Sequence, residues 1–167
     1  MNSLLDTFPD DLNPLDSVEA VLTSHNWEFS RINSDELMVQ VAGKACTYRL
    51  FFIWQEDISA MQFCVQYDLT ILGDQHMDTR EAMMNINETI VMGHFDLPRE
   101  TGTPTFRHTS LFRGSCYEAG LERLEDLVDI SLTLCEKYFP VFSLLCGTAP
   151  MDEKSMSLAL METVGES

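Results

Sequence analysis

Basic residues and long apolar runs are both scarce in this chain. No apolar stretch approaches the ~20 residues that a helix needs to span a bilayer. Only 10 Lys and Arg stand against 27 Asp and Glu in 167 residues, so the formal net charge is −17. Such a chain repels nucleic-acid phosphates and anionic membrane surfaces, and we expect neither as a partner. The charge favours solubility or a basic partner.

The first thirty residues and the cysteines indicate the cellular compartment. No Lys or Arg precedes Arg31, so the N-terminus lacks the basic start of a secretory signal peptide, and we expect a cytoplasmic protein. The five cysteines form no CxxC pair, which argues against both a disulfide framework and a zinc finger. We expect reduced, mostly buried thiols at Cys46, Cys64, Cys116, Cys135 and Cys146.

Catalytic motifs are missing as well, since the chain contains no GxSxG, HExxH, GxGxxG or P-loop. Two histidines, two acidic residues and two arginines surround a Gly/Pro-rich turn in GHFDLPRETGTPTFRH, residues 93–108. Strand alternation there predicts Phe95 and His108 on one face and His94 and Arg107 on the other. A shared metal would need converging ring nitrogens at ~2.0–2.1 Å. We therefore predict a structural hairpin, and no catalytic, metal or cofactor-binding residues.

Four segments have the periodicity of helices. The first runs from Asn13-Pro14, an N-cap followed by proline, to about His25. The second starts near Asp78 and ends by Gly93, and a long helix begins near Tyr117. Pro140 should kink or end that long helix. A short amphipathic helix is predicted over residues 152–162.

The segments between these helices alternate with the period of strands. Residues 27–32 read as one strand, and ELMVQVAGKACTYRLFFIW reads as two strands around a two-residue Gly43-Lys44 loop. That loop would place Val39 opposite Tyr48, and the next turn would place Trp54 opposite Met61. Two more strands are predicted over residues 93–98 and 105–113.

This order of elements predicts an α+β fold, with an antiparallel sheet of five to six strands and helices packed on one face. Residues 1–12 are interpreted as a loose N-terminal leader, and residues 13–167 as a single domain. The second face of the sheet carries both polar and apolar side chains. A face exposed only to solvent would not need this many apolar ones. We predict a partner or dimer surface there, open to either use, formed by Met38, Phe51, Ile53, Gln62 and Cys64.

Several stretches resemble one known family over nearly the whole chain, from about residue 13 to residue 166. They are WEFSRINSDELMVQVAG, YRLFFIWQEDISAMQFC, INETIVMGHFDLPRETGTPTFRHTSLFRG, LEDLVDISLTLCEKYFPVFSLL and LALMETVGE. The most specific pattern is Asn87, Gly93, Phe95, Gly102 and Arg107-His108. These stretches resemble the YbjN-domain proteins, a family of bacterial sensory transduction regulators. The resemblance implies a fold like that of type III secretion chaperones, often homodimeric, without enzymatic activity.

We therefore expect a non-enzymatic regulatory or chaperone-like protein that binds a protein client, as a homodimer and without a cofactor. The alternative is a small-molecule sensor or small enzyme with a pocket between the sheet and the helices. Its candidate residues are Arg49, Asp68 and His108. A third reading is a structural subunit of a larger assembly.

Overall fold

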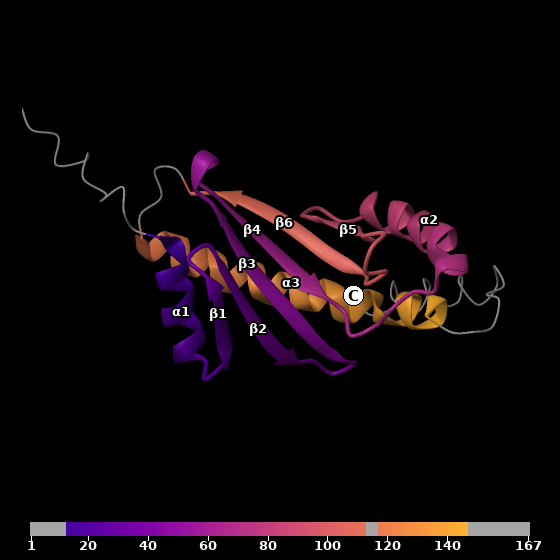
Figure 1. Ribbon diagram of the computed structural model, residues 1–167, viewed down its shortest axis with the longest axis horizontal. Coiled ribbons are helices and arrows are strands. Elements are labelled where there is room, and N and C mark those ends of the chain that lie inside the picture. Colours follow the sequence, from indigo (N-terminus) through magenta and orange to yellow (C-terminus); the bar gives the residue numbers. More distant parts are fainter. Residues whose placement is uncertain (1–12, 113–116, 147–167) are drawn as a thin grey trace, which may run out of the picture.

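The computed structural model describes residues 13–112 and 117–146. The predictions for residues 1–12 and 152–162 lie outside this part of the chain. The described residues form a six-stranded antiparallel sheet, in the order β1-β2-β3-β4-β6-β5, and three α-helices (Figure 1). The helices are α1 (Pro14–Ser24), α2 (His76–Asn87) and α3 (Tyr117–Leu145). The strands are β1 (Phe29–Asn33), β2 (Glu36–Ala42), β3 (Thr47–Gln55), β4 (Ala60–Gln66), β5 (His94–Asp96) and β6 (Thr105–Leu111).

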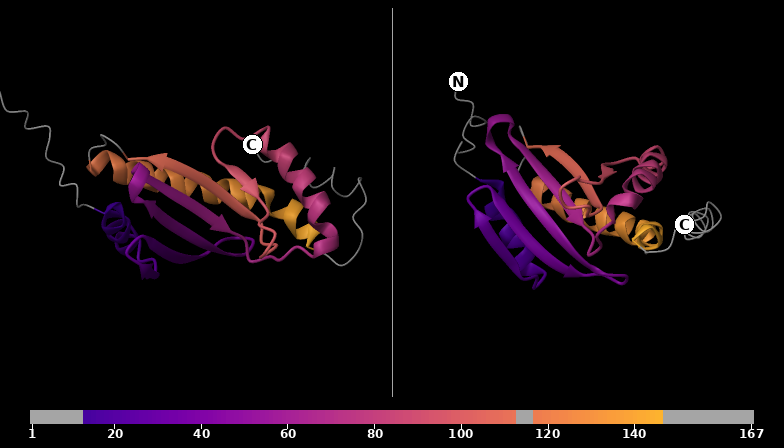
Figure 2. Two further views of the ribbon diagram at one scale, coloured as in Figure 1. Left: turned by 45° about the horizontal axis from the view of Figure 1, so that its top comes forward. Right: turned by 45° about the vertical axis from the view of Figure 1, so that its right-hand side comes forward.

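The helices share one side of the sheet, which we call the inner face. Helix α3 forms a second layer along the sheet, α1 packs against α3 and β3, and α2 packs beside β5 and the end of α3 (Figure 2). None of the described helices covers the opposite, outer face. The α+β prediction, with helices on one face of an antiparallel sheet, is confirmed.

Helix α1 begins where its cap predicts. The Asn13 side chain accepts a hydrogen bond from the Leu15 N–H at 3.0 Å, and Pro14 occupies the first helical position. Leu15, Val18 and Leu22 are at most 2% exposed and belong to the core. Their helical spacing places them on the stripe that faces the sheet and α3.

The predicted register of β3 and β4 is also confirmed, with Trp54 opposite Met61. The predicted register of β2 and β3 is wrong by two residues, because Val39 pairs with Leu50 and not with Tyr48. The loop between these strands therefore has four residues, 43–46, in place of two. A shift by two residues leaves every side chain on its predicted face.

A contact with α3 explains the longer loop. The Glu136 carboxylate accepts hydrogen bonds from the backbone N–H groups of Lys44 at 2.6 Å and Ala45 at 3.2 Å. Gly43 lies so close to this carboxylate that a Cβ there would sit 2.3 Å from its Oε1 atom. The loop is thus shaped around an acidic side chain from the far end of the sequence.

One helix end differs from the prediction, and the proline predicted to kink or end a helix does not end it. Helix α2 ends at Asn87, not near Gly93, and the Asn87 side chain bonds the backbone of β5. Helix α3 continues through Pro140 to Leu145. Proline inside a helix costs ~3 kcal/mol. Burial of large apolar side chains, at ~1.5–3 kcal/mol each, offsets that cost. Those side chains are the fully buried Val141, Phe142 and Leu145.

Candidate functional site

The polar hairpin of residues 93–108 is built as strand alternation predicts. His94 pairs with Arg107 in the β5–β6 ladder, so both lie on the outer face. His108 follows Arg107 in β6 and lies on the inner face, opposite Phe63. The two histidines are on opposite faces, as predicted. Among the described residues, no group of three His, Cys, Asp or Glu side chains is placed to hold a metal ion.

Several polar side chains in and beside this hairpin have structural partners. The Asn87 side chain donates to the Phe95 carbonyl at 3.0 Å and accepts from the Phe95 N–H at 2.7 Å. The Arg107 Nε donates to Asp96 Oδ2 at 2.7 Å. Gly93 has a φ of +68°, and a Cβ there would meet the Phe106 ring at 2.3 Å. The stretch that carries the most specific resemblance therefore holds a short edge strand in place.

The five residues predicted as a partner or dimer surface are contiguous on the outer face, and we call them the outer patch. They are Met38, Phe51, Ile53, Gln62 and Cys64. Phe51 pairs with Met38 on one side and with Cys64 on the other, and Ile53 pairs with Gln62. Phe51, Ile53, Met38 and Gln62 are half-buried within this chain. The surface role itself stays a prediction.

Cys64 lies at the base of the outer patch and is only 3% exposed. The Arg107 Nη1 donates to its Sγ at 3.6 Å. Burial raises the pKa of the Cys64 thiol, and the Arg107 charge partly opposes that rise. Buried Cys64 thus adds little contact area to the outer patch, and the other four residues of the patch supply it. Sequence reasoning missed Leu111, which is 68% exposed and is the last residue of β6, on the same face.

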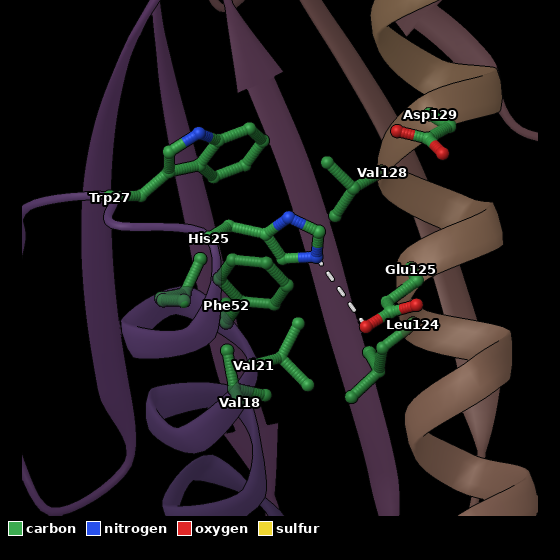
Figure 3. Close-up of a pocket in the computed structure, with 10 residues that line it drawn as sticks. Val18, Val21, His25, Trp27, Phe52, Leu124, Glu125, Val128 and Asp129 are labelled. Atoms are coloured by element: carbon green, nitrogen blue, oxygen red, sulfur yellow. Dashed lines mark ion pairs between the residues drawn. The ribbon is translucent and has the colours of Figure 1, made fainter.

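A second feature lies between α1, α3 and the sheet, and we call it the α1–α3 pocket. Its volume is about 80 Å³. The His25 Nε2 lies 3.4 Å from Glu125 Oε1 at its side, and Trp27 forms part of its wall (Figure 3). The full lining is Val18, Val21, Leu22, His25, Trp27, Phe52, Leu124, Glu125, Val128 and Asp129.

The alternative reading of the sequence, a pocket between the sheet and the helices, has different candidate residues. Arg49 pairs with Gln40 and Gln66 on the outer face, whereas His108 is on the inner face. Arg49, Asp68 and His108 do not line the α1–α3 pocket. No local pattern could have found its lining, because α1, β3 and α3 meet only through the tertiary fold.

Comparison with known proteins gives a family and a fold. The YbjN family, described as "Putative bacterial sensory transduction regulator", matches residues 14–144. A similar solved structure is the "Crystal structure of YbjN, a putative transcription regulator from E. coli", with a TM-score of 0.50 and 10% sequence identity. That match covers 72% of this chain and 87% of the other, and at this identity it supports the fold alone. Comparison with curated proteins finds no match.

The length and hydropathy of the described helices bear on membrane insertion. None of those in residues 13–112 and 117–146 has the length and hydropathy needed to cross a membrane. The family match spans most of the chain, and a YbjN structure is similar to this one at the level of the fold. The chain therefore belongs to the YbjN family.

Proposed function

We propose that this chain is a non-enzymatic, chaperone-like regulatory protein of the cytoplasm that binds a protein partner through the outer patch and acts as a homodimer. The observation that carries the proposal is the patch itself. Phe51 and Ile53 stand half-exposed on the sheet, Met38 pairs with Phe51 across the strands, and no described helix covers them.

The geometry of the outer patch suits a flat apolar contact. Full burial of a large apolar side chain contributes ~1.5–3 kcal/mol. Because Phe51 and Ile53 are already half-buried, a partner that covered both would gain roughly 2 kcal/mol from them. Side chains held by cross-strand neighbours lose little conformational freedom on binding, so more of that gain is retained.

The charge of the chain supports regulation through proteins. The E. coli YbjN structure is described as that of "a putative transcription regulator". A net charge of −17 repels the DNA backbone, so a regulatory role here fits contact with another protein better than contact with DNA. A basic or apolar protein segment is the matching chemistry for this surface.

The test replaces Phe51 and Ile53 by Asp together. We expect the wild-type protein to have the mass of a dimer in size-exclusion chromatography with light scattering, and the double variant the mass of a monomer. Affinity capture from the native host, read by mass spectrometry, should lose its partner proteins in parallel. Gln40→Asp is the matched control, because it adds charge to an exposed position on the same face outside the patch.

The outcomes separate the two uses of the patch. A dimeric wild type that becomes monomeric in the double variant supports the homodimer. A monomeric wild type whose captured partners disappear in the double variant would place a client on the patch and contradict the homodimer. If the folded double variant keeps both its mass and its partners, the surface assignment is wrong.

A further inference from the structure

The α1–α3 pocket has apolar walls and a volume that a small ligand could fill. Its wall residues Val18 and Leu22 are 2% exposed and Phe52 is 1% exposed, so this part of the lining is apolar and shielded from solvent. An engineered apolar cavity of ~150 Å³ accommodates benzene. At about 80 Å³, this pocket would accommodate roughly half as many atoms, which is three or four carbons.

The rim of the pocket on α3 is acidic. Glu125 and Asp129 both line it, and they lie one helical turn apart on the same side of α3. Glu125 is 47% exposed, so its carboxylate stays hydrated and can turn toward a ligand. Because the whole chain carries a charge of −17, an anionic head group would be repelled from this rim.

The surroundings of His25 indicate which chemical groups the rim of the pocket can bind. Its ring lies between the Trp27 indole, at a centroid distance of 5.9 Å, and the Glu125 carboxylate at 3.4 Å (Figure 3). A nitrogen donor thus already sits between an aromatic ring and a carboxylate, which is an arrangement that favours cations. The His25 side chain is 51% exposed and has room to turn aside.

From these observations we propose that the α1–α3 pocket binds a small primary alkylamine. The alkyl chain lies between α1 and α3, and the ammonium lies at Glu125 and Asp129. A compact ammonium has three rotatable donors and can contact two carboxylates that are a helical turn apart, whereas a planar guanidinium needs one carboxylate facing its fork. This site is separate from the outer patch, and it stands or falls independently of the proposed dimer.

The test compares three ligands of one size: n-butylamine, n-butanol and butyrate, at pH 7 and fixed ionic strength. The readout is the indole N–H signals of Trp27 and Trp54 in proton–nitrogen correlation spectra of the full chain. Trp27 lines the pocket and Trp54 does not, so Trp54 is an internal reference. We expect n-butylamine to shift the Trp27 signal saturably, with an affinity about tenfold above that of n-butanol, and butyrate to cause no shift.

Two variant pairs separate head-group recognition from general electrostatics. Glu125→Gln with Asp129→Asn should weaken n-butylamine binding about fivefold to tenfold, from two half-exposed charge pairs, and leave n-butanol binding unchanged. Glu122→Gln with Asp126→Asn removes the same charge at the same spacing on α3, outside the pocket lining. This control pair should change n-butylamine binding by less than about twofold.

Val21→Phe fills the pocket from α1 and should abolish the shift of Trp27 by either ligand. The proposal is overturned if Trp27 shows no saturable shift, or if n-butanol binds as tightly as n-butylamine. It is also overturned if both variant pairs lose the same affinity, because the amine would then respond to overall charge alone. The rim variants are surface changes, so they keep the test decisive even if Val21→Phe fails to fold.

Discussion

The hydrogen bonds between Asn87 and Phe95 make the sharpest prediction about stability. Strand β5 has three residues and lies at the edge of the sheet, so its free side has no neighbouring strand among the residues that the structure describes. The Asn87 side chain takes that place by bonding both the N–H and the C=O of Phe95, at 2.7 Å and 3.0 Å. Asn87→Ala removes both hydrogen-bonding partners of the Phe95 backbone at once. The Phe95 side chain is only 2% exposed.

The size of the effect follows from the two backbone groups left without partners. An unsatisfied buried donor or acceptor costs ~1–3 kcal/mol. Both hydrogen bonds are part-buried, which favours the lower end for each, so we expect a total loss of about 2–3 kcal/mol. With a urea m-value of ~1–3 kcal/mol/M, the unfolding midpoint should fall by roughly 1–2 M.

Urea unfolding followed by circular dichroism measures this loss. Asn85→Ala is the matched control, because Asn85 is in the same helix, exposed, and outside these bonds. That control should change the free energy of unfolding by less than about 0.5 kcal/mol. If Asn87→Ala costs no more than Asn85→Ala at equal m-values, the side-chain amide does not hold the edge strand and the reasoning fails.

Two further predictions concern the same hairpin. Gly93→Ala places a Cβ 2.3 Å from the Phe106 ring at a φ of +68°, so the free energy of unfolding should fall by about 1–3 kcal/mol; an unchanged thermal midpoint would contradict this. Burial lowers the pKa of His108 below 6.5, so the unfolded chain binds the proton more readily, and stability should fall as the pH drops through about 6.5. In urea titrations between pH 7.5 and 5, His108→Gln should remove that loss and His94→Gln should not; equal profiles would refute the assignment.

Whether each candidate site could be predicted from the sequence depends on how far apart its residues lie along the chain. The outer patch could be predicted because period-two alternation assigns Phe51 and Ile53 to the face opposite the core, whatever the register. The α1–α3 pocket could not, because His25, Phe52 and Glu125 are distant in sequence and no periodicity links them. Only the packing of α1 against α3 and the sheet brings them together.

Local chemistry in the sequence determined the start of α1, since Asn13 and Pro14 act within one helical turn. It also determined which side chains face the core, since alternation needs no distant contact. The pairing of β2 with β3 was decided by the tertiary structure. A shift of two residues preserves both faces, so hydrophobic pattern cannot choose between two registers. The Glu136 carboxylate on α3 binds the loop at Lys44 and Ala45 across 92 and 91 residues and selects the longer turn.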